Sequence, residues 1–344
     1  MPTSGQPFRI FVVGAGTFGR NHLRVYRELA AAGVAVELVA VIDPSEESLS
    51  RASIDFNVRG FRSVAEALEV VGAPDAASIC APTEHHASAA QLLLSAGVHC
   101  LIEKPIAASL EQADVMLATA RAHRAIVQVG HLERFNPAVT AARPLLNRPM
   151  FFEAHRLSVF TPRSLDVDVV LDLMIHDLDI VLSFVNSPLC EIRAVGLPVL
   201  SRKVDIANVR VEFENGCIAN FTASRVSTER VRKLRFFQPH QYLSLDFARQ
   251  DLLMIDVIEA DPAQLAALSQ KLHLSDHRSP GLSLKKISLE AGEPLRLEIQ
   301  SFLNAIHRGE APAVSGEDGR RSLALALSIN EAIREHANRA GLSI

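Results

Sequence analysis

Hydrophobic residues in the first 130 positions follow two alternating patterns. Short β-branched runs bounded by turn residues predict strands at 8–13, 36–42, 76–81, 98–102 and 125–129. The stretches between them predict helices, with capping-box patterns at 63–66 and 109–112 and with Gly33 and Gly97 where helix C-caps belong. Strands that alternate with helices are typical of a parallel sheet covered by helices. The sequence therefore predicts a doubly wound α/β domain at 1–130.

The pattern changes after about residue 137. A largely apolar stretch predicts one long helix at 167–185, and alternating runs predict strands at 191–197, 207–214, 217–225 and 231–237. Asn215 and Gly216, between two of these strands, are typical of a type I′ hairpin, so this part is at least partly antiparallel. Residues 261–294 predict an irregular excursion, and helices are predicted at 295–308 and 318–340. We therefore expect a C-terminal α+β domain at 131–344, whose last helices can pack back on the first domain.

Composition and charge narrow the function classes. The chain has 344 residues, enough for two domains, and 48% hydrophobic residues, which excludes a largely disordered protein. Its 35 basic and 39 acidic residues leave a net charge of -4, which excludes a general attraction to nucleic acid or an anionic membrane. No secretory pattern and no long apolar window occurs, so we expect a cytoplasmic protein without a transmembrane helix. Any anionic ligand must be bound locally.

The four cysteines predict free, buried thiols. They lack C-x-x-C spacing and lie in apolar runs, as expected in a reducing compartment. A disulfide or a zinc site is the alternative, and no metal site is expected. The residues are Cys80, Cys100, Cys190 and Cys217.

Residues 14–19, GAGTFG, match G-x-G-x-x-G directly after a predicted strand and before a predicted helix. Such glycines allow a tight turn and close approach to a pyrophosphate, which N–H groups at a helix N-terminus bind. Asp43 ends the next strand, where its carboxylate can accept hydrogen bonds from ribose hydroxyls and would repel a 2′-phosphate. NAD is therefore expected rather than NADP; a glycine-rich turn without a cofactor and an FAD site are the alternatives. The predicted contacts are Gly14, Gly16, Thr17, Phe18, Gly19 and Asp43.

Two further segments carry candidate chemistry. Glu103-Lys104-Pro105 follows a predicted strand, at the sheet edge where ligands bind, and Pro105 restricts the backbone of Lys104 or permits a cis bond. A solvated lysine is the alternative.

The predicted helix 167–185 carries a stripe of polar residues at spacings of three and four. Burying such a stripe is costly unless its side chains line a water-filled cleft or have polar partners. The alternative is a core histidine satisfied by an aspartate. The stripe comprises Asp168, Asp172, His176 and Asp179.

These motifs together resemble the Gfo/Idh/MocA family of NAD(P)-dependent oxidoreductases, over essentially the whole chain. Pro82-Thr83 with His86, residues 134–137 and residues 314–319 are also similar to recurring segments of that family. The resemblance implies a Rossmann domain and a C-terminal domain with a large, open, mostly antiparallel sheet used for homo-oligomerisation as a dimer or tetramer. It also implies a pyranose or cyclitol substrate. The glycine-rich stretch common before the family's aspartate is replaced here by residues 166–170, DVDVV.

Residues 130–137 and 167–177 are most similar to a narrower bacterial branch of the family. That branch oxidises UDP-N-acetylglucosamine at C3, ahead of an aminotransferase on the route to lipid A of lipopolysaccharide. The resemblance implies catalytic roles for Lys104, Asp172 and His176, and cofactor contacts from Pro82, Thr83, His86, Glu103 and Lys104. The implied UDP-sugar contacts are Lys104, His131, Glu133, Arg134, Asn136, Arg163, Asp172, His176 and Arg225.

A local basic cluster could also meet a diphosphate, although strand-borne arginines are often ordinary surface residues. The cluster comprises Arg225, Arg230, Arg232, Lys233 and Arg235.

Oxidation of a secondary alcohol requires a base for the hydroxyl proton while a hydride leaves the carbon. His176 is the first candidate, because imidazole accepts protons near neutral pH, and Asp172 could orient it or bind the sugar. Lys104 would stabilise the developing alkoxide, and the base assignment between Lys104 and His176 stays open. Oxidation of another UDP-hexosamine, a UDP-uronic acid or inositol, and a non-catalytic NAD-binding sensor, also remain open.

Overall fold

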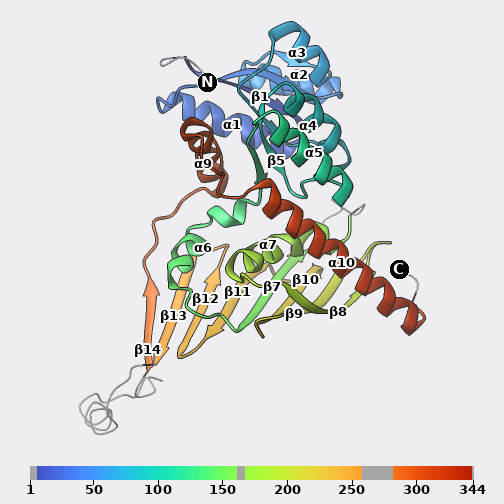
Figure 1. Cartoon of the computed structure of the whole chain (residues 1–344), viewed down its shortest axis with the longest axis vertical. Coiled ribbons are helices and arrows are strands. Elements are labelled where there is room, and N and C mark those ends of the chain that lie inside the picture. The colour runs from blue at the N-terminus through green and yellow to red at the C-terminus, as the bar shows by residue number, and fades with distance from the viewer. Residues whose placement is uncertain (1–5, 161–166, 258–281, 343–344) are drawn as a thin grey trace. The chain divides into compact units, whose positions relative to one another are not determined.

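The computed structural model describes residues 6–160, 167–257 and 282–342. The chain divides into two compact units, the first comprising 1–135 and 292–325 and the second 136–291 and 326–344. The chain thus passes between the units after residues 135, 291 and 325. Each unit has its own sheet (Figure 1).

A six-stranded parallel sheet forms the centre of the first unit, in the order β3-β2-β1-β4-β5-β6. The order reverses between β1 and β4, and in open sheets of this kind nucleotides bind at the carboxyl ends of the strands beside such a reversal. This confirms the predicted Rossmann domain. The strands are β1 (Phe8–Val13), β2 (Val36–Ile42), β3 (Gly60–Phe61), β4 (Ala76–Ile79), β5 (His99–Glu103) and β6 (Val127–Gly130).

Helices follow the strands of this unit and begin at the predicted caps. Ser63 and Ser109 accept hydrogen bonds from the N–H groups of Glu66 and Gln112, as the capping-box patterns predict. The helices are α1 (Thr17–Ala31), α2 (Glu46–Phe56), α3 (Val64–Val71), η1 (Thr83–His85), α4 (His86–Ser95), α5 (Leu110–Ala122), η2 (Leu132–Phe135) and α9 (Pro294–Arg308). Helix α10 (Gly316–Ala340) contributes its first turns to this unit and its remainder to the second.

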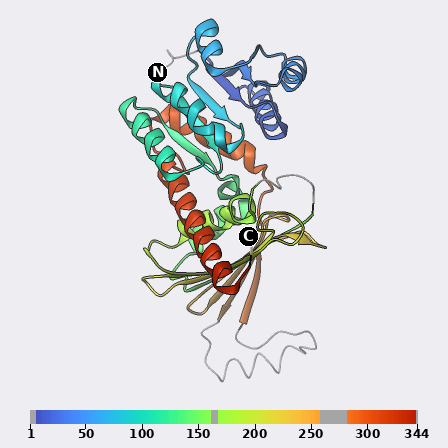
Figure 2. The same cartoon turned by 90° about the vertical axis from the view of Figure 1, so that its right-hand side faces the viewer.

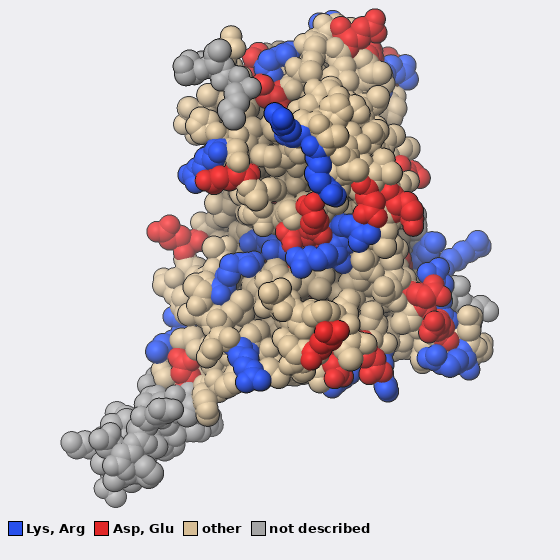
Figure 3. Space-filling view, in the orientation of Figure 1, with Lys and Arg blue, Asp and Glu red and all other residues tan. Residues whose placement is uncertain are grey.

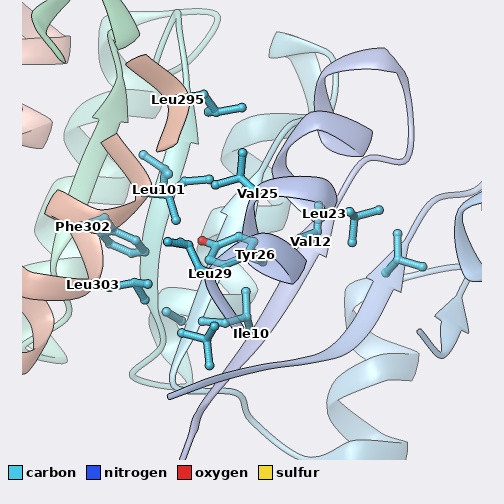
Figure 4. Close-up of a cluster of buried hydrophobic side chains, with 14 of the residues drawn as sticks. Ile10, Val12, Leu23, Val25, Tyr26, Leu29, Leu101, Leu295, Phe302 and Leu303 are labelled. Atoms are coloured by element: carbon cyan, nitrogen blue, oxygen red, sulfur yellow. The ribbon is translucent and has the colours of Figure 1, made fainter. Parts of the chain in front are cut away.

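Apolar side chains of α1 and α9 form one core of the first unit with β1 and β5 (Figure 4). Tyr26 lies within this core and its hydroxyl forms a 2.9 Å hydrogen bond with Ser78, which satisfies the one polar atom it buries. Full burial of a leucine or phenylalanine contributes about 1.5–3 kcal/mol, so these contacts hold α9 on α1 although they are far apart in sequence. The labelled members are Ile10, Val12, Leu23, Val25, Tyr26, Leu29, Leu101, Leu295, Phe302 and Leu303.

An eight-stranded sheet forms the second unit, in the order β14-β13-β12-β11-β7-β10-β9-β8. All neighbouring strands are antiparallel except β7 and β10, which confirms the mostly antiparallel sheet. Helices α6 and α7 lie on one face of this sheet (Figure 2). The strands are β7 (Phe151–Val159), β8 (Leu189–Leu197), β9 (Ile206–Phe213), β10 (Ile218–Ser227), β11 (Val231–Gln238), β12 (Gln241–Asp246), β13 (Asp251–Val257) and β14 (Leu282–Ile287). The helices are α6 (Pro137–Ala142), η3 (Arg143–Leu145), η4 (Val170–Met174) and α7 (Ile175–Phe184).

Several local expectations need correction. The long helix predicted at 167–185 is present, but its first part, η4, is π-helical and only α7 is α-helical. The turn before β10 is not type I′, because only Gly216 has positive φ; a Phe213–Gly216 hydrogen bond closes a turn with glycine at its end. Residues 261–281 of the expected irregular excursion lie outside the described residues, and 282–287 form the regular strand β14. All four cysteines are free as predicted, but Cys190 is exposed on β8 and Cys80 is only partly buried.

Among the described residues, no helix is both long and apolar enough to cross a membrane. The same residues contain no group of three or more side chains placed to hold a metal ion.

Candidate active site

The glycine-rich loop has the close packing that a dinucleotide site requires. A Cβ added to Gly19 would lie 1.8 Å from the carbonyl oxygen of Gly14, so only glycine lets α1 approach the end of β1 this closely. Gly14 itself has a φ of 96°, which glycine adopts without strain. Gly16, Thr17 and Phe18 are exposed, and α1 begins at Gly16 without a side-chain cap or an acidic first turn. The N–H groups at this helix terminus therefore suit a phosphate.

Asp43 ties the loop to the second strand. One carboxylate oxygen accepts the N–H of Ala15 at 2.7 Å and the other accepts the N–H of Ser45 at 2.8 Å. The carboxylate thus lies beside the glycine-rich loop and remains partly exposed, where a ribose hydroxyl could donate to it. The loop and Asp43 together fit the adenosine diphosphate half of NAD. Bound NAD would supply the hydride acceptor of an oxidation.

The Glu103–Pro105 turn follows β5 at the same sheet edge, and its Lys104–Pro105 peptide bond is cis. Glu103 is buried against His22 of α1, and Lys104 is partly exposed. The ring of His86 is 1% exposed and its two nitrogens lie 2.8 and 2.9 Å from carbonyl oxygens of Ala81 and Pro105, and its predicted cofactor contact stays a prediction. Burial lowers the pKa of His86, and the hydrogen bonds to these carbonyls oppose that effect.

Residues 131–136 are more buried than a substrate loop would suggest. His131, Glu133 and Asn136 are each at most 6% exposed. The side chain of Asn136 caps α6 and also donates to the carbonyl of Phe247 at 3.0 Å. Arg134 lies 3.9 Å from Asp318 in the same unit. These contacts position the segment, and its predicted role in substrate binding stays a prediction. The Asn-Pro pair at 136–137 is a helix-start signal that sequence reasoning passed over.

The π-helix η4 carries Asp172, and His176 is the second residue of α7. Both side chains are partly exposed, whereas Asp177 and Asp179 beside them are buried. π-Helical turns are rare and occur frequently at functional sites. Asp168, the first acid of the predicted stripe, instead caps this helix: its carboxylate accepts N–H groups of Val170 and Leu171 at 2.9 and 3.0 Å.

Two polar contacts that sequence reasoning missed fix this helix on the sheet. Arg156 of β7 and Asp177 of α7 form a buried two-bond ion pair at 2.8 and 2.9 Å. Such a pair has a defined geometry, because the guanidinium fork matches the carboxylate. It fixes the residue next to His176 directly to the sheet.

Arg225 and Asp205 form the second contact. Arg225 donates to the carbonyl of Val167 at 2.6 Å, and its Nε lies 3.8 Å from Asp205. Asp205 accepts N–H groups of the 199–201 turn and the Ser201 hydroxyl. Burial alone would raise the pKa of Asp205, but these hydrogen bonds lower it to about 2. The contacts give Arg225 a structural role, and its predicted substrate role stays a prediction.

The predicted basic cluster is divided by the strands that carry it. Lys233 and Arg235 share one face of β11 and pair with Asp246 and Glu153, at 3.9 and 2.8 Å. Arg232 points to the other face by strand alternation, and Arg225 is buried. Figure 3 shows basic and acidic side chains intermixed on the face in view. Arg163, also expected at the substrate site, lies outside the described residues.

The strand order, the glycine-rich loop and Asp43 define the class: a dinucleotide-dependent oxidoreductase with a Rossmann domain and a separate sheet domain. Two family models match the chain: "Oxidoreductase family, NAD-binding Rossmann fold" at residues 8–131, and "GFO/IDH/MocA C-terminal domain" at 146–238. The chain is 34% identical over 339 residues to UDP-N-acetylglucosamine 3-dehydrogenase of Acidithiobacillus ferrooxidans, covering 96% of this chain and 99% of that one. This chain therefore belongs to the Gfo/Idh/MocA family of NAD-binding oxidoreductases.

The chain is also similar to a more distant relative and to two solved structures. Myo-inositol 2-dehydrogenase of Thermotoga maritima is 23% identical, over 95% of this chain and 96% of that one. The solved structure of the Acidithiobacillus ferrooxidans enzyme superposes with a TM-score of 0.84, covering 95% of this chain and 97% of that one. Levoglucosan dehydrogenase in complex with NADH, at 16% identity, has a TM-score of 0.82 over 96% of this chain and 98% of that one, which shows the shared fold.

Proposed function

We propose that this protein catalyses the NAD-dependent oxidation of UDP-N-acetylglucosamine at its C3 hydroxyl, giving the 3-keto sugar nucleotide. The observation that carries the proposal is the 34% identity to an enzyme of that name across nearly the full length of both chains. The presence of Lys104, Asp172 and His176 supports a catalytic protein rather than a cofactor sensor. A product ketone is a substrate for an aminotransferase, so we place the reaction before an amination, in lipid A precursor synthesis.

The residues of this chain have separable roles in the proposal. The glycine-rich loop and Asp43 bind the adenosine diphosphate half of the cofactor. His176 accepts the hydroxyl proton as the C3 hydride leaves, and Asp172 orients His176 or binds the sugar. Lys104 places a positive charge beside the developing alkoxide, which lowers the barrier electrostatically. Lys104 is the alternative proton acceptor.

The first experiment measures NADH formation with UDP-N-acetylglucosamine, with an aminotransferase present to remove the ketone. We expect His176→Asn to lower kcat by about 10²–10⁴-fold and Lys104→Met by about 10²–10³-fold. If both groups serve the same step, the double variant loses little more than the worse single variant. The matched controls are His240→Asn and Lys203→Met, at exposed positions, which should leave kcat unchanged.

A substrate panel tests the sugar assignment. It contains another UDP-hexosamine, a UDP-uronic acid and myo-inositol, beside UDP-N-acetylglucosamine. Turnover of a different member with a higher kcat/KM would overturn the substrate while leaving the enzyme class intact. Binding of NADH without turnover of any sugar would indicate a sensor.

A further inference from the structure

Two buried histidines anchor the residues on either side of Lys104. His22 of α1 lies with its Nε2 3.0 Å from the Glu103 carboxylate; a carboxylate only accepts, so this nitrogen donates. His86, at the start of α4, lies with Nδ1 2.9 Å from the carbonyl oxygen of Pro105. The two histidines are 0% and 1% exposed. The backbone of Lys104 is thus held at its preceding and its following residue by different helices.

The packing leaves Glu103 little freedom. Gly130 pairs with Glu103 across β5 and β6, and a Cβ added there would lie 2.7–2.8 Å from the Glu103 carboxylate atoms. The carboxylate therefore occupies space that any other residue at position 130 would fill. With His22 on one side and Gly130 on the other, Glu103 is fixed in place.

Both histidines also connect to the loops that the proposed cofactor site uses. The ring of Phe18, in the glycine-rich loop, packs on the ring of His22 with centroids 5.6 Å apart. The second ring nitrogen of His86 lies 2.8 Å from the carbonyl oxygen of Ala81, directly before Pro82 and Thr83. All of these residues belong to the first unit. They form a continuous path: Phe18, His22, Glu103, Lys104, Pro105, His86 and Ala81.

We propose that His22 and His86 are positioning residues that hold Lys104 in register with the two cofactor loops. They do not contact the reacting atoms; they act through Glu103 and Pro105. The inference rests on the proposed function, in which Lys104 stabilises the alkoxide. The additional claim is that two side chains, His22 on α1 and His86 on α4, determine the position of Lys104. Both helices begin at the cofactor loops.

The atom used by each histidine allows a sharp test with two amide variants. The Nε2 of glutamine can occupy the position of histidine Nε2, and the Nδ2 of asparagine the position of Nδ1. His22 contacts Glu103 through Nε2, so His22→Gln should keep kcat near the wild-type value, whereas His22→Asn lowers it. His86 contacts Pro105 through Nδ1 and Ala81 through Nε2, so each amide variant keeps one contact; His86→Asn keeps the contact to the residue after Lys104 and should retain more activity than His86→Gln, the reverse of the order at His22. If the two histidines only filled space, the order of the Gln and Asn variants would not reverse between the two positions.

We expect the losing variant at each position to lower kcat by about 10- to 100-fold, the effect of a misplacement near 1 Å. In a Lys104→Met background the same substitutions should change kcat by less than about 2-fold, because their effect passes through the lysine. Urea unfolding and NADH binding identify any variant that has not folded. Equal losses of kcat in the wild-type and Lys104→Met backgrounds would overturn the proposal. It would also be overturned if glutamine retained more activity than asparagine at both positions, or asparagine more than glutamine at both.

A second measurement does not depend on the substrate. Limited labelling with an amine-reactive reagent, read by peptide mass spectrometry, gives the labelling rate of Lys104 relative to exposed Lys203. The ratio should match wild type in His22→Gln and His86→Asn and differ in the opposite pair. If no sugar is oxidised, the proposed function fails while this ratio still decides the positioning role. An unchanged ratio in all four variants would contradict it.

Discussion

Gly16 and Gly19 lie in the same loop, but a methyl group added at each would meet different surroundings. At Gly19 it would lie 1.8 Å from the carbonyl oxygen of Gly14, whereas at Gly16 nothing lies within 4 Å. Gly19→Ala should therefore lower the free energy of unfolding by about 1–3 kcal/mol. Gly16→Ala should leave unfolding unchanged and weaken NAD binding, because this glycine lets the backbone approach the pyrophosphate.

Urea unfolding and NADH titration of the two variants check this difference. Equal stability losses in both variants would mean that the loop relaxes freely at Gly19. Unchanged NADH affinity in Gly16→Ala would remove this loop from the cofactor site.

Individual site residues were predictable where a motif fixed their place in the chain. The glycine-rich loop and Asp43 were of this kind, because strand, turn and helix follow one another directly. His22 was not predicted, although it lies three residues after Gly19 on the buried side of α1, where a polar residue needs a partner. Its partner, Glu103, is distant in sequence, and no local pattern could identify it. Asp168 was counted in the polar stripe without a role of its own, because the spacing of aspartates along a helix does not show which of them caps it.

Asp205 organises the turn between β8 and β9, beside the helix that carries Asp172 and His176. Its pKa falls from 3.8 to about 2 in the folded chain. A lowered carboxylate pKa stabilises the fold at pH values above the unfolded pKa, and this stabilisation is lost as the pH falls toward 2. At neutral pH it amounts to about 2 kcal/mol.

Asp205→Asn should therefore lower the free energy of unfolding by about 2 kcal/mol near neutral pH, and by less near pH 3. Urea unfolding at the two pH values measures the difference, with exposed Glu214→Gln as the control. A gap between wild type and variant that stays constant across this pH range would show that the charge of Asp205 contributes nothing.

At the scale of elements, the hydrophobic period predicted most of the strands and helices but not every boundary or helix type. Asp168, which caps the π-helix η4, also accepts a 3.0 Å hydrogen bond from Asn330, a contact between segments far apart in sequence. Strand β7 lies at the centre of its sheet and was not predicted, and neither were β12, β13 and β14. Their pairing with β11 and with each other is set by the assembled sheet.

At the scale of the whole molecule, we propose a homo-oligomer formed through the second unit's sheet. On β9 the residues Ala207, Val209 and Val211 are buried, while the alternating Asn208 and Arg210 are exposed. Two copies that meet by a two-fold axis would place this exposed face against itself. Asn208→Glu/Arg210→Glu should therefore dissociate the oligomer by like-charge repulsion, whereas Arg51→Glu on α2 should not.

Sedimentation velocity measures the change. Wild type should sediment as a dimer or tetramer and the double variant as a smaller species. A monomeric wild type, or a double variant that sediments like wild type, would exclude this face as the interface.

The two-domain architecture was predictable because each half has its own hydrophobic period. The membership of α9 in the first unit was less predictable from the sequence alone, because this depends on the packing of its apolar side chains against α1. The fold alone does not identify the substrate, because proteins named for inositol and for levoglucosan share this fold.

The most direct test of the central claim is therefore the initial rate of NADH formation by the full chain with UDP-N-acetylglucosamine, with an aminotransferase removing the ketone. We predict NADH formation that depends on the sugar nucleotide, gives the 3-keto product and falls by about 10²-fold or more in His176→Asn. No NADH from UDP-N-acetylglucosamine under these conditions, with NADH binding intact, would contradict the proposed function.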